Sequence, residues 1–543
     1  MRNIIILSLA IGIWMRVGSA EDISHIKIVS WYQSITDYQA FSRTIDDVIT
    51  HLRETNTEFV FRAFWRWNAI PDECPIGDTE CELAGRSYAH LENAIIEIKS
   101  ELPNIIICGG IAFERINAQE RNPITGETFD RDETWAMALD PGEYGIDYWG
   151  TPPESKVNFQ EDRANLLGFA PPGPYDTLTA YAYYPDILNP DFQQLLISWA
   201  KKQIDCGVDA IWVDMLFAQA RIFSVVTGDP HYYAVEESYE AACAIVDSIH
   251  EYGSSIGRNI YVGVWNNFLE IDTTYYAPPD VDFIVVMIWE SELWDTTLYA
   301  ARWNAFVDKV KSFMGDTILI IPFMDEATVN WEDQPLGIFS QYYDSETQRN
   351  MLMYMDSFFF EISQSDSVPI TFMYPIHGGW MGNNATILAF DSFNVYDALA
   401  PEFNTYETIV ELSNHKLEIV EETFFQPITY SLTAFPNPFN SSVVITVSDG
   451  RGLASQTLTN IKVYDLRGNV VYAPSSVPSS SGHLLPEGEG QILPSPTGRG
   501  TEGEGIKSSF IWQPDETIAS GIYFVKVRTK YGLPKTKPII YLK

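Results

Sequence analysis

The feature that most constrains the fold is a short apolar run that ends in a carboxylate. Residues 207–215 read Gly-Val-Asp-Ala-Ile-Trp-Val-Asp-Met, so a buried-strand pattern stops at Asp214. The stretch before it, residues 189–204, begins Asn-Pro-Asp and carries apolar residues at helical spacing, which predicts a helix leading into a strand. This order is typical of a parallel barrel, where active groups sit at the C-terminal strand ends. Asp214 is therefore predicted to lie at a barrel mouth.

Eight strand-like runs alternate with helical patterns between residues 21 and 412. The predicted strands are residues 26–31, 59–65, 105–113, 210–214, 260–265, 283–289, 318–323 and 370–374. Helical patterns cover residues 45–54, 91–101, 239–252, 298–313 and 346–362. The alternation predicts an α/β fold, a (β/α)8 TIM barrel.

Residues 117–186, rich in Pro, Gly and Tyr, separate the third and fourth predicted strands. A plain loop of that length is uncommon in a compact domain. We interpret the segment as an insertion that shapes the substrate site. The alternative, a separate small domain, would need a core of its own, and residues 166–184 offer little for one.

The fourth strand and its helix resemble those of many polysaccharide-active (β/α)8 glycoside hydrolases. The agreement lies in Asn189, Pro190, Gly207, Asp209 and Asp214, and Ala210 replaces the usual second glycine. In the α-galactosidase-like barrels, the nucleophile ends strand four and the acid/base ends strand six. The resemblance therefore implies Asp214 as nucleophile and Glu290 as acid/base, although that family has Asp at the latter position.

Other residues suited to a sugar site follow the predicted strand ends. Glycosidic bond hydrolysis usually needs two carboxyl groups, and sugar subsites combine aromatic faces with polar donors. The candidate substrate-binding residues are Trp31, Arg62, Trp65, Trp67, Glu114, Trp265, Asn266, Trp289, Asp325, Glu326, Tyr374 and His377. Taken singly, each aromatic residue is more often a packing residue, and acids after strands are often helix caps. Asp209, near the strand start, is expected on the opposite, stabilising face.

A second domain is predicted after a linker at residues 413–429. Residues 435–440 read Phe-Pro-Asn-Pro-Phe-Asn, residues 461–468 end in Tyr-Asp-Leu-Arg-Gly, and residues 519–527 contain Gly-Ile-Tyr-Phe-Val. This set resembles the type IX secretion (Por-type) sorting tail, which implies an all-β Ig-like sandwich over residues 430–543 and export through secretion machinery. Residues 474–505, rich in Pro, Gly, Ser and Glu, are predicted to be a disordered insertion in it.

The N-terminus and the charge also indicate an exported protein. Residues 1–20 have a basic start, an apolar core and small residues before Ala20, as in a signal peptide. No later run is long and apolar enough to predict a membrane span. The net charge of −39 would repel nucleic acid and anionic membranes. We therefore expect a secreted or cell-surface protein.

Cysteine usage is sparse, with five in the chain. Cys74 and Cys81 lie close together in a loop with Pro, Gly and Asp, where either a small disulfide or two free thiols would fit. Cys108, Cys206 and Cys243 fall in apolar contexts, where a buried free thiol is common. No metal-ligand spacing is recognisable, so neither metal nor cofactor is expected.

These observations favour a secreted glycoside hydrolase that cleaves a neutral polysaccharide or oligosaccharide with two carboxyl groups. One alternative is a non-catalytic carbohydrate-binding barrel, which would keep the aromatic residues but leave its acids unpaired. Another is a surface adhesin that uses the barrel as a spacer and has no aromatic-lined site. The sugar and its linkage depend on loop shape and are not predicted.

Overall fold

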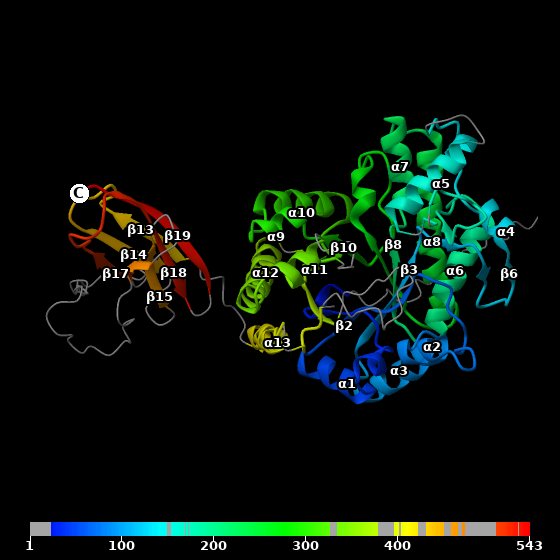
Figure 1. Cartoon of the computed structure of the whole chain (residues 1–543), viewed down its shortest axis with the longest axis horizontal. Coiled ribbons are helices and arrows are strands. Elements are labelled where there is room, and N and C mark those ends of the chain that lie inside the picture. The colour runs from blue at the N-terminus through cyan, green and yellow to red at the C-terminus, as the bar shows by residue number, and fades with distance from the viewer. Residues whose placement is uncertain are drawn as a thin grey trace, which may run out of the picture. The chain divides into compact units, whose positions relative to one another are not determined.

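The computed structural model describes thirteen stretches of the chain. They are residues 23–148, 154–168, 170–171, 173–325, 334–366, 368–377, 396–400, 403–421, 430–449, 458–464, 470–472, 507–529 and 532–543. The chain divides into two compact units, residues 1–417 and residues 418–543, both visible in Figure 1. The predicted signal peptide and the insertion at residues 474–505 lie outside the described residues.

The first unit is built on a sheet of eight parallel strands. The strands are β1 (Val29–Tyr32), β2 (Phe59–Arg66), β3 (Ile106–Ala112), β8 (Ala210–Asp214), β9 (Tyr261–Trp265), β10 (Phe283–Met287), β11 (Leu319–Phe323) and β12 (Met373–His377). Their spatial order is β11-β10-β9-β8-β3-β2-β1-β12. A parallel bridge between Ile320 and Ile370 joins the two ends of this order. The predicted (β/α)8 barrel is confirmed.

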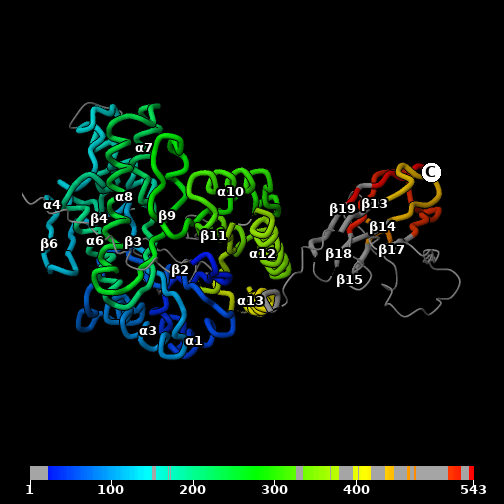
Figure 2. The backbone as a smooth tube through the Cα atoms, turned by 180° about the vertical axis from the view of Figure 1, so that it is seen from behind, coloured from blue at the N-terminus to red at the C-terminus, as the bar shows by residue number. Residues whose placement is uncertain are grey.

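Helices surround the barrel, as Figures 1 and 2 show. They are α1 (Ile45–Glu54), α2 (Thr79–Ala84), α3 (Tyr88–Glu101), α6 (Pro190–Asp205), α7 (Ala218–Thr227), α8 (Tyr233–Ser255), α9 (Glu290–Trp294), α10 (Ala300–Met314), α11 (Pro335–Gly337), α12 (Ser345–Asp366) and α13 (Tyr406–Glu421). The β9–β10 connection holds only the 3-10 helix η4 (Asn266–Glu270). Helix α13 runs across residue 413, where the linker was predicted to begin.

Local sequence explains where these helices begin. Thr44 and Asp47 form a reciprocal capping box at α1, which satisfies backbone N–H groups that the first turn leaves open. At α6 the Asn189 side chain accepts from the N–H groups of Asp191 and Phe192, and Pro190 takes the first helical position, where its missing N–H costs nothing. Helix α6 then delivers the chain to β8 and Asp214.

The segment between β3 and α6 is an elaborated insertion. It contains β4 (Ile116–Asn117), β5 (Glu120–Arg121), β6 (Thr128–Phe129), α4 (Arg131–Ala136), η3 (Pro141–Tyr144), α5 (Glu154–Leu166) and β7 (Ala182–Tyr183). Phe159, Tyr183 and Tyr184 of this segment are buried within the main core. The cyan segment lies on the side of the barrel that carries α6 and α7 (Figures 1 and 2). It therefore shares the barrel's core instead of forming its own.

The second unit is all-β. Its strands are β13 (Tyr430–Phe435), β14 (Val443–Asp449), β15 (Leu458–Tyr464), β16 (Val470–Tyr472), β17 (Lys507–Trp512), β18 (Gly521–Thr529) and β19 (Gly532–Tyr541). They pair antiparallel in two sheets, β13-β14-β17 and β16-β15-β18-β19. Val443 and Ile445 of the first sheet share one buried core with Val463 and Val525 of the second. Two sheets that bury a common core form a β-sandwich.

Candidate active site

Asp214 ends β8 at the barrel mouth and is half-buried. Trp265, at the end of the neighbouring strand β9, donates its indole N–H to the Asp214 carboxylate. Burial raises the pKa of Asp214 to about 7, the charge of Asp325 acts in the same direction, and Arg62 and the Trp265 hydrogen bond oppose it. A carboxyl group with such a pKa exchanges protons near neutral pH, which suits acid–base chemistry.

Arg62 brings a buried positive charge to the same region. It lies in β2, where the pairing with β3 is irregular between Val60 and Phe64, and its φ is +54°. Left-handed backbone is costly for a side-chain-bearing residue and is held only by its surroundings. The guanidinium is 3.6 Å from Asp325, which follows β11. This bulge thus directs the Arg62 guanidinium towards the carboxylates of Asp214 and Asp325, which belong to other strands.

Aromatic rings enclose the Arg62 guanidinium. It lies 4.5 Å from the Trp65 ring and 5.4 Å from those of Trp31 and Trp212, distances at which a cation is attracted to a π face. The indole N–H groups of Trp65 and Trp212 meet no hydrogen-bond acceptor among the described residues. Both nitrogen atoms are buried from solvent.

A glycine permits this packing. A Cβ on Gly110 of β3 would stand 2.7 Å from the Trp65 ring, closer than real Cβ contacts allow. Trp65 in turn stacks on Trp67, with ring centroids 6.2 Å apart and planes 19° apart. Trp67 packs against Ala164 and Ala182 of the insertion. The insertion therefore supports the aromatic side of the mouth.

Glu114 is a third acid in this region. It follows β3, whose Ala112 pairs in register with Asp214. Burial and the charge of Asp214 raise the pKa of Glu114 to about 8, while Arg163 and Arg221 act in the opposite direction. Tyr184, whose hydroxyl has no partner among the described residues, lies near enough for the two to interact electrostatically. Glu114 is thus neither a helix cap nor a solvated acid.

Glu290 occupies a different setting. It is the first residue of α9 and is half-buried. Its charge acts on Arg302 of α10, whose guanidinium covers one face of the half-exposed Trp289 at 3.9 Å. The groups that shift the pKa of Asp214 are Arg62, Asp325 and Trp265. The role of Glu290 as acid/base stays a prediction, as does sugar binding by Trp289 and the half-buried Asn266. Glu326 lies outside the described residues.

The structure corrects the expectation for two aromatic residues. Trp31 is only 1% exposed and packs inside the barrel, edge-on to Phe323, so it supports Arg62 instead of facing a ligand. Tyr374 is fully buried and donates its hydroxyl to Asp356 of α12 at 2.8 Å. Asp356 also pairs with Lys416 at 2.6 Å. Tyr374 therefore points into the helix layer, away from the mouth.

His377 ends β12 but is already fully engaged. Its Nδ1 lies 3.1 Å from Asp397 and its Nε2 3.3 Å from Asp37. These two carboxylates raise the pKa of His377 to about 9 against the opposing effect of burial. Arg43 pairs with Asp397 at 2.7 Å. With both ring nitrogens taken and 3% exposure, this histidine holds the β1 and β12 loops together and is unsuited to contact a sugar.

At the N-terminal end of β8, in contrast to the Asp214 end, the carboxylate lies beside two cations. Asp209, just before the strand, lies 2.6 Å from Lys99 and 3.3 Å from Arg258, and it accepts from the backbone N–H of Ile107. A cavity of about 430 Å³ lies beside it, lined by Lys99, Asp209 and Arg258 among others. The expected stabilising role of Asp209 fits these contacts, whereas Asp214 has a raised pKa and forms no ion pair of this kind with the described residues.

One residue that the sequence analysis overlooked is Trp212. It stands two residues before Asp214 and therefore faces the same side of β8. Its ring approaches those of Phe61, Trp65 and Trp265 at 4.9, 5.4 and 5.9 Å. The alternation of side chains along a strand was the signal that could have identified it.

Among the described residues, one group has metal-ligand geometry, namely Cys74, Glu82 and His90 in the β2–α3 connection. It shares no residue with the acids at the mouth. Cys74 is disulfide-bonded to Cys81, so the open question about this pair is settled as a bridge. Cys108, Cys206 and Cys243 are free.

The chain was compared with known families and proteins. Residues 433–483 match the family model described as "Secretion system C-terminal sorting domain". The search of curated proteins gave no match. None of the helices in the described part of the chain has the length and apolar character to cross a membrane.

Three solved structures illustrate the alignments. An endo-beta-1,4-mannanase from Thermotoga petrophila aligns at 12% identity and a TM-score of 0.35, covering 95% of this chain and 97% of its own. A cyclic alpha-maltosyl-(1→6)-maltose hydrolase from Arthrobacter globiformis aligns at 10% identity and a TM-score of 0.40, covering 80% of this chain and 92% of its own. An Anoxybacillus alpha-amylase aligns at 9% identity and a TM-score of 0.40, covering 91% of this chain and 99% of its own. Because these TM-scores are below 0.5, the barrel assignment depends on the strand pairing alone.

The family match does carry a conclusion about the second unit. It begins within β13 and extends past β16, so it falls on the β-sandwich. The C-terminal unit is a secretion-system sorting domain, and the protein is directed to the cell surface or the extracellular space.

Proposed function

We propose that this protein is an exported glycoside hydrolase that cleaves a neutral glycan at the barrel mouth, between Asp214 and Asp325. The observation that supports this most is the coupling of these two acids. They follow β8 and β11, which are three strands apart in the sheet, yet the charge of Asp325 raises the pKa of Asp214. A pair of neighbouring carboxyl groups from different strands is what hydrolysis of a glycosidic bond requires.

The environments of the two acids suit different roles. Asp214 holds a proton at pH values below about 7 and would pass it to the departing glycosidic oxygen. Asp325 has the Arg62 guanidinium at 3.6 Å, which favours a carboxylate that attacks the sugar carbon or activates a water molecule. The glycosidic C–O bond breaks and one water is consumed. Whether configuration is retained depends on the separation between the two carboxyl groups.

The surrounding side chains fit a neutral sugar. The half-buried rings of Trp65 and Trp67 stack on each other, and their exposed parts offer apolar surface for sugar C–H groups. Two buried cations lie at these rings, and both are engaged. Arg62 has a carboxylate partner in Asp325, and Arg115, 5.0 Å from the Trp67 ring, donates to Asn68 and Asn117. These features favour a neutral sugar over an acidic one.

The roles implied by the family resemblance form a second assignment, with Asp214 as nucleophile and Glu290 as acid/base. The charge of Glu290 acts on Arg302, and Glu290 is not among the groups that shift the pKa of Asp214. The two assignments differ in which second acid is essential. Asp325→Asn should abolish turnover under the first assignment, and Glu290→Gln should do so under the second.

The test is release of reducing sugar by the full chain from a panel of neutral and amino-sugar polysaccharides. We expect Asp214→Asn and Asp325→Asn each to lower kcat by about 10²- to 10⁴-fold, the typical contribution of a positioned acid or base. Asp209→Asn, just before the other end of the same strand, is the matched control and should keep kcat. Binding to a polysaccharide without turnover, in wild type and variants alike, would contradict the enzyme and support a carbohydrate-binding barrel.

A further inference from the structure

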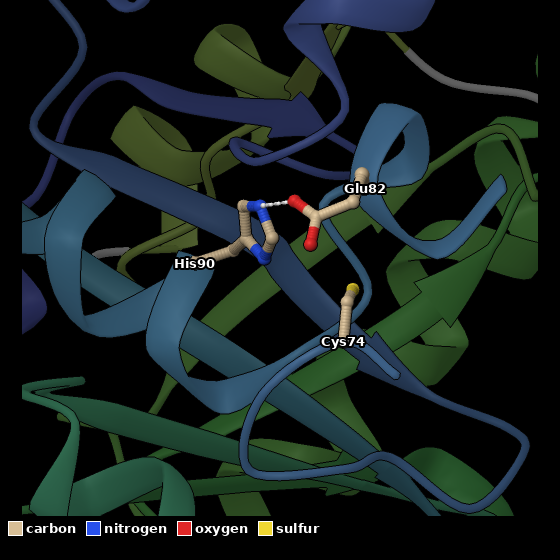
Figure 3. Close-up of side chains that lie close together, drawn as sticks. All are labelled: Cys74, Glu82 and His90. Atoms are coloured by element: carbon tan, nitrogen blue, oxygen red, sulfur yellow. Dashed lines mark ion pairs between the residues drawn. The ribbon is translucent and has the colours of Figure 1, made fainter. Parts of the chain in front are cut away.

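A cluster of sulfur, nitrogen and oxygen donors lies in the connection between β2 and α3, apart from the acids of the mouth. We name it the α2–α3 cluster, and its members are Cys74, Cys81, Glu82 and His90 (Figure 3 draws three of them). Ligand atoms of Cys74, Glu82 and His90 all lie within 4.8 Å of one another. The fourth donor, Cys81, is bonded to Cys74 through sulfur and therefore lies beside the same point.

Two helix caps fix these side chains. Asp78 caps α2 by accepting from the N–H of Cys81 at 3.0 Å. Ser87 caps α3 by accepting from the N–H of His90 at 3.3 Å. Gly85, in left-handed backbone between the two helices, packs so closely on Thr36 that a Cβ would stand 2.1 Å from its carbonyl oxygen. The turn that brings Cys81 near His90 is therefore rigid.

The hydrogen bonds of His90 orient the ring as in a metal ligand. Its Nδ1 lies 2.7 Å from Ser87 Oγ, and its Nε2 lies 3.4 Å from Glu82. Figure 3 shows Nε2 directed at Glu82. When Nδ1–H donates to Ser87, the Nε2 lone pair is free for a cation. Metal-binding histidines commonly use their second nitrogen in this way.

We propose that the α2–α3 cluster has two exclusive states, the disulfide when oxidised and a Zn²⁺ site when reduced. Two thiolates, one imidazole and one carboxylate form a four-donor set that suits tetrahedral Zn²⁺. In such a site neighbouring ligand atoms are about 3.3–3.8 Å apart. The present spacing, within 4.8 Å, needs the sulfur atoms to separate and the other donors to close in by roughly 1 Å.

The exchange between the states balances with a dithiol reductant. The reductant's thiolate attacks one sulfur, the Cys74–Cys81 bond breaks, and the reductant leaves as its own disulfide. Two cysteine thiols result. Zn²⁺ then displaces two protons from them, because thiolate is the ligand form. Either state ties the β2 loop to α2, and the metal additionally recruits His90 of α3. A chain that has not yet been oxidised would thus hold this connection by metal.

The experiment measures zinc in the full-length protein, kept oxidised or reduced with a phosphine, after incubation with Zn²⁺ and gel filtration. We expect one Zn²⁺ per reduced chain and none per oxidised chain. Co²⁺ bound in place of Zn²⁺ should give the intense absorption of thiolate–cobalt charge transfer. Absence of zinc from the folded, reduced wild type would overturn the proposal.

Variants separate this site from the other thiols. His90→Ala should weaken Zn²⁺ binding by more than the 10- to 100-fold that loss of an outer-shell partner typically costs, while His231→Ala, which alters an exposed histidine paired with Asp272, should leave it unchanged. Cys74→Ala with Cys81→Ala should abolish binding even though Cys108, Cys206 and Cys243 remain. Circular dichroism confirms that each variant is folded. Equal zinc in reduced wild type and reduced His90→Ala would overturn the proposal.

Discussion

Trp265 and Asp214 are neighbours across two strand ends, and the indole N–H donates to the carboxylate. The pairing of Val213 with Val264 sets this register. A hydrogen bond to a carboxylate favours its charged form. The bond therefore holds the pKa of Asp214 below the value that burial and Asp325 would otherwise produce.

The first prediction concerns the pH profile of turnover. If protonated Asp214 is the acid, kcat/KM should fall as pH rises through about 7, the pKa of that group, because the proton is present below this pH and lost above it. Glu114→Gln should keep this alkaline limb, since Glu114 has its own pKa near 8. Initial rates between pH 5 and 9 measure this profile. Loss of the alkaline fall of kcat/KM in Glu114→Gln would assign the role of general acid to Glu114.

Trp265→Phe should move the fall of kcat/KM to higher pH. The change removes a hydrogen bond to the charged form of Asp214, and such bonds contribute about 1.5–3 kcal/mol, so a rise of about one to two pH units is expected. Phenylalanine keeps most of the ring that packs at 5.4 Å from Phe323. A limb that stays in place would mean that Trp265 does not bind the carboxylate in solution.

Gly110→Ala should disturb the aromatic side of the mouth. The added methyl would meet the Trp65 ring at 2.7 Å, and overpacking of this kind costs about 1–3 kcal/mol. Urea unfolding measures the loss. Combining it with Trp65→Leu, which makes room beside residue 110, should recover part of the stability, and simple additivity of the two losses would argue against the contact.

Tyr374→Phe tests the corrected role of that residue. Loss of the hydroxyl that donates to the Asp356 carboxylate should lower the free energy of unfolding by about 1.5–3 kcal/mol, with kcat/KM unchanged. Asp356 keeps Lys416 as a partner. A large increase in KM without a change in stability would return Tyr374 to the substrate site.

Much of the barrel was predictable because each strand is a compact apolar run. The prediction for residues 210–214 coincides with β8, and that for residues 45–54 coincides with α1. The last strand was misplaced at residues 370–374, whereas β12 is Met373–His377. This shift explains the error at Tyr374, which lies inside the strand and not at its end.

The composition of the site was only partly predictable. Asp214 can be identified from the sequence because it ends a strand. Asp325 cannot, because its place beside Asp214 and Arg62 depends on closure of the barrel, which brings β11 near β2 and β8. Arg62 reaches this point through a bulge with φ of +54°, and nothing in the local sequence specifies that conformation. His377 likewise owes its partners to residues 37 and 397, distant along the chain.

The barrel closes between β11 and β12 with fewer backbone hydrogen bonds than join β10 to β11. Between β11 and β12 the closure consists of the Ile320–Ile370 bridge and the backbone bonds of Ile320 with Pro369 and Thr371, whereas β10 and β11 pair through five successive residues. Transient opening starts where few hydrogen bonds must break together. The barrel therefore has a seam beside the strand that leads to Asp325, and amide hydrogens there should exchange with solvent before those of β8.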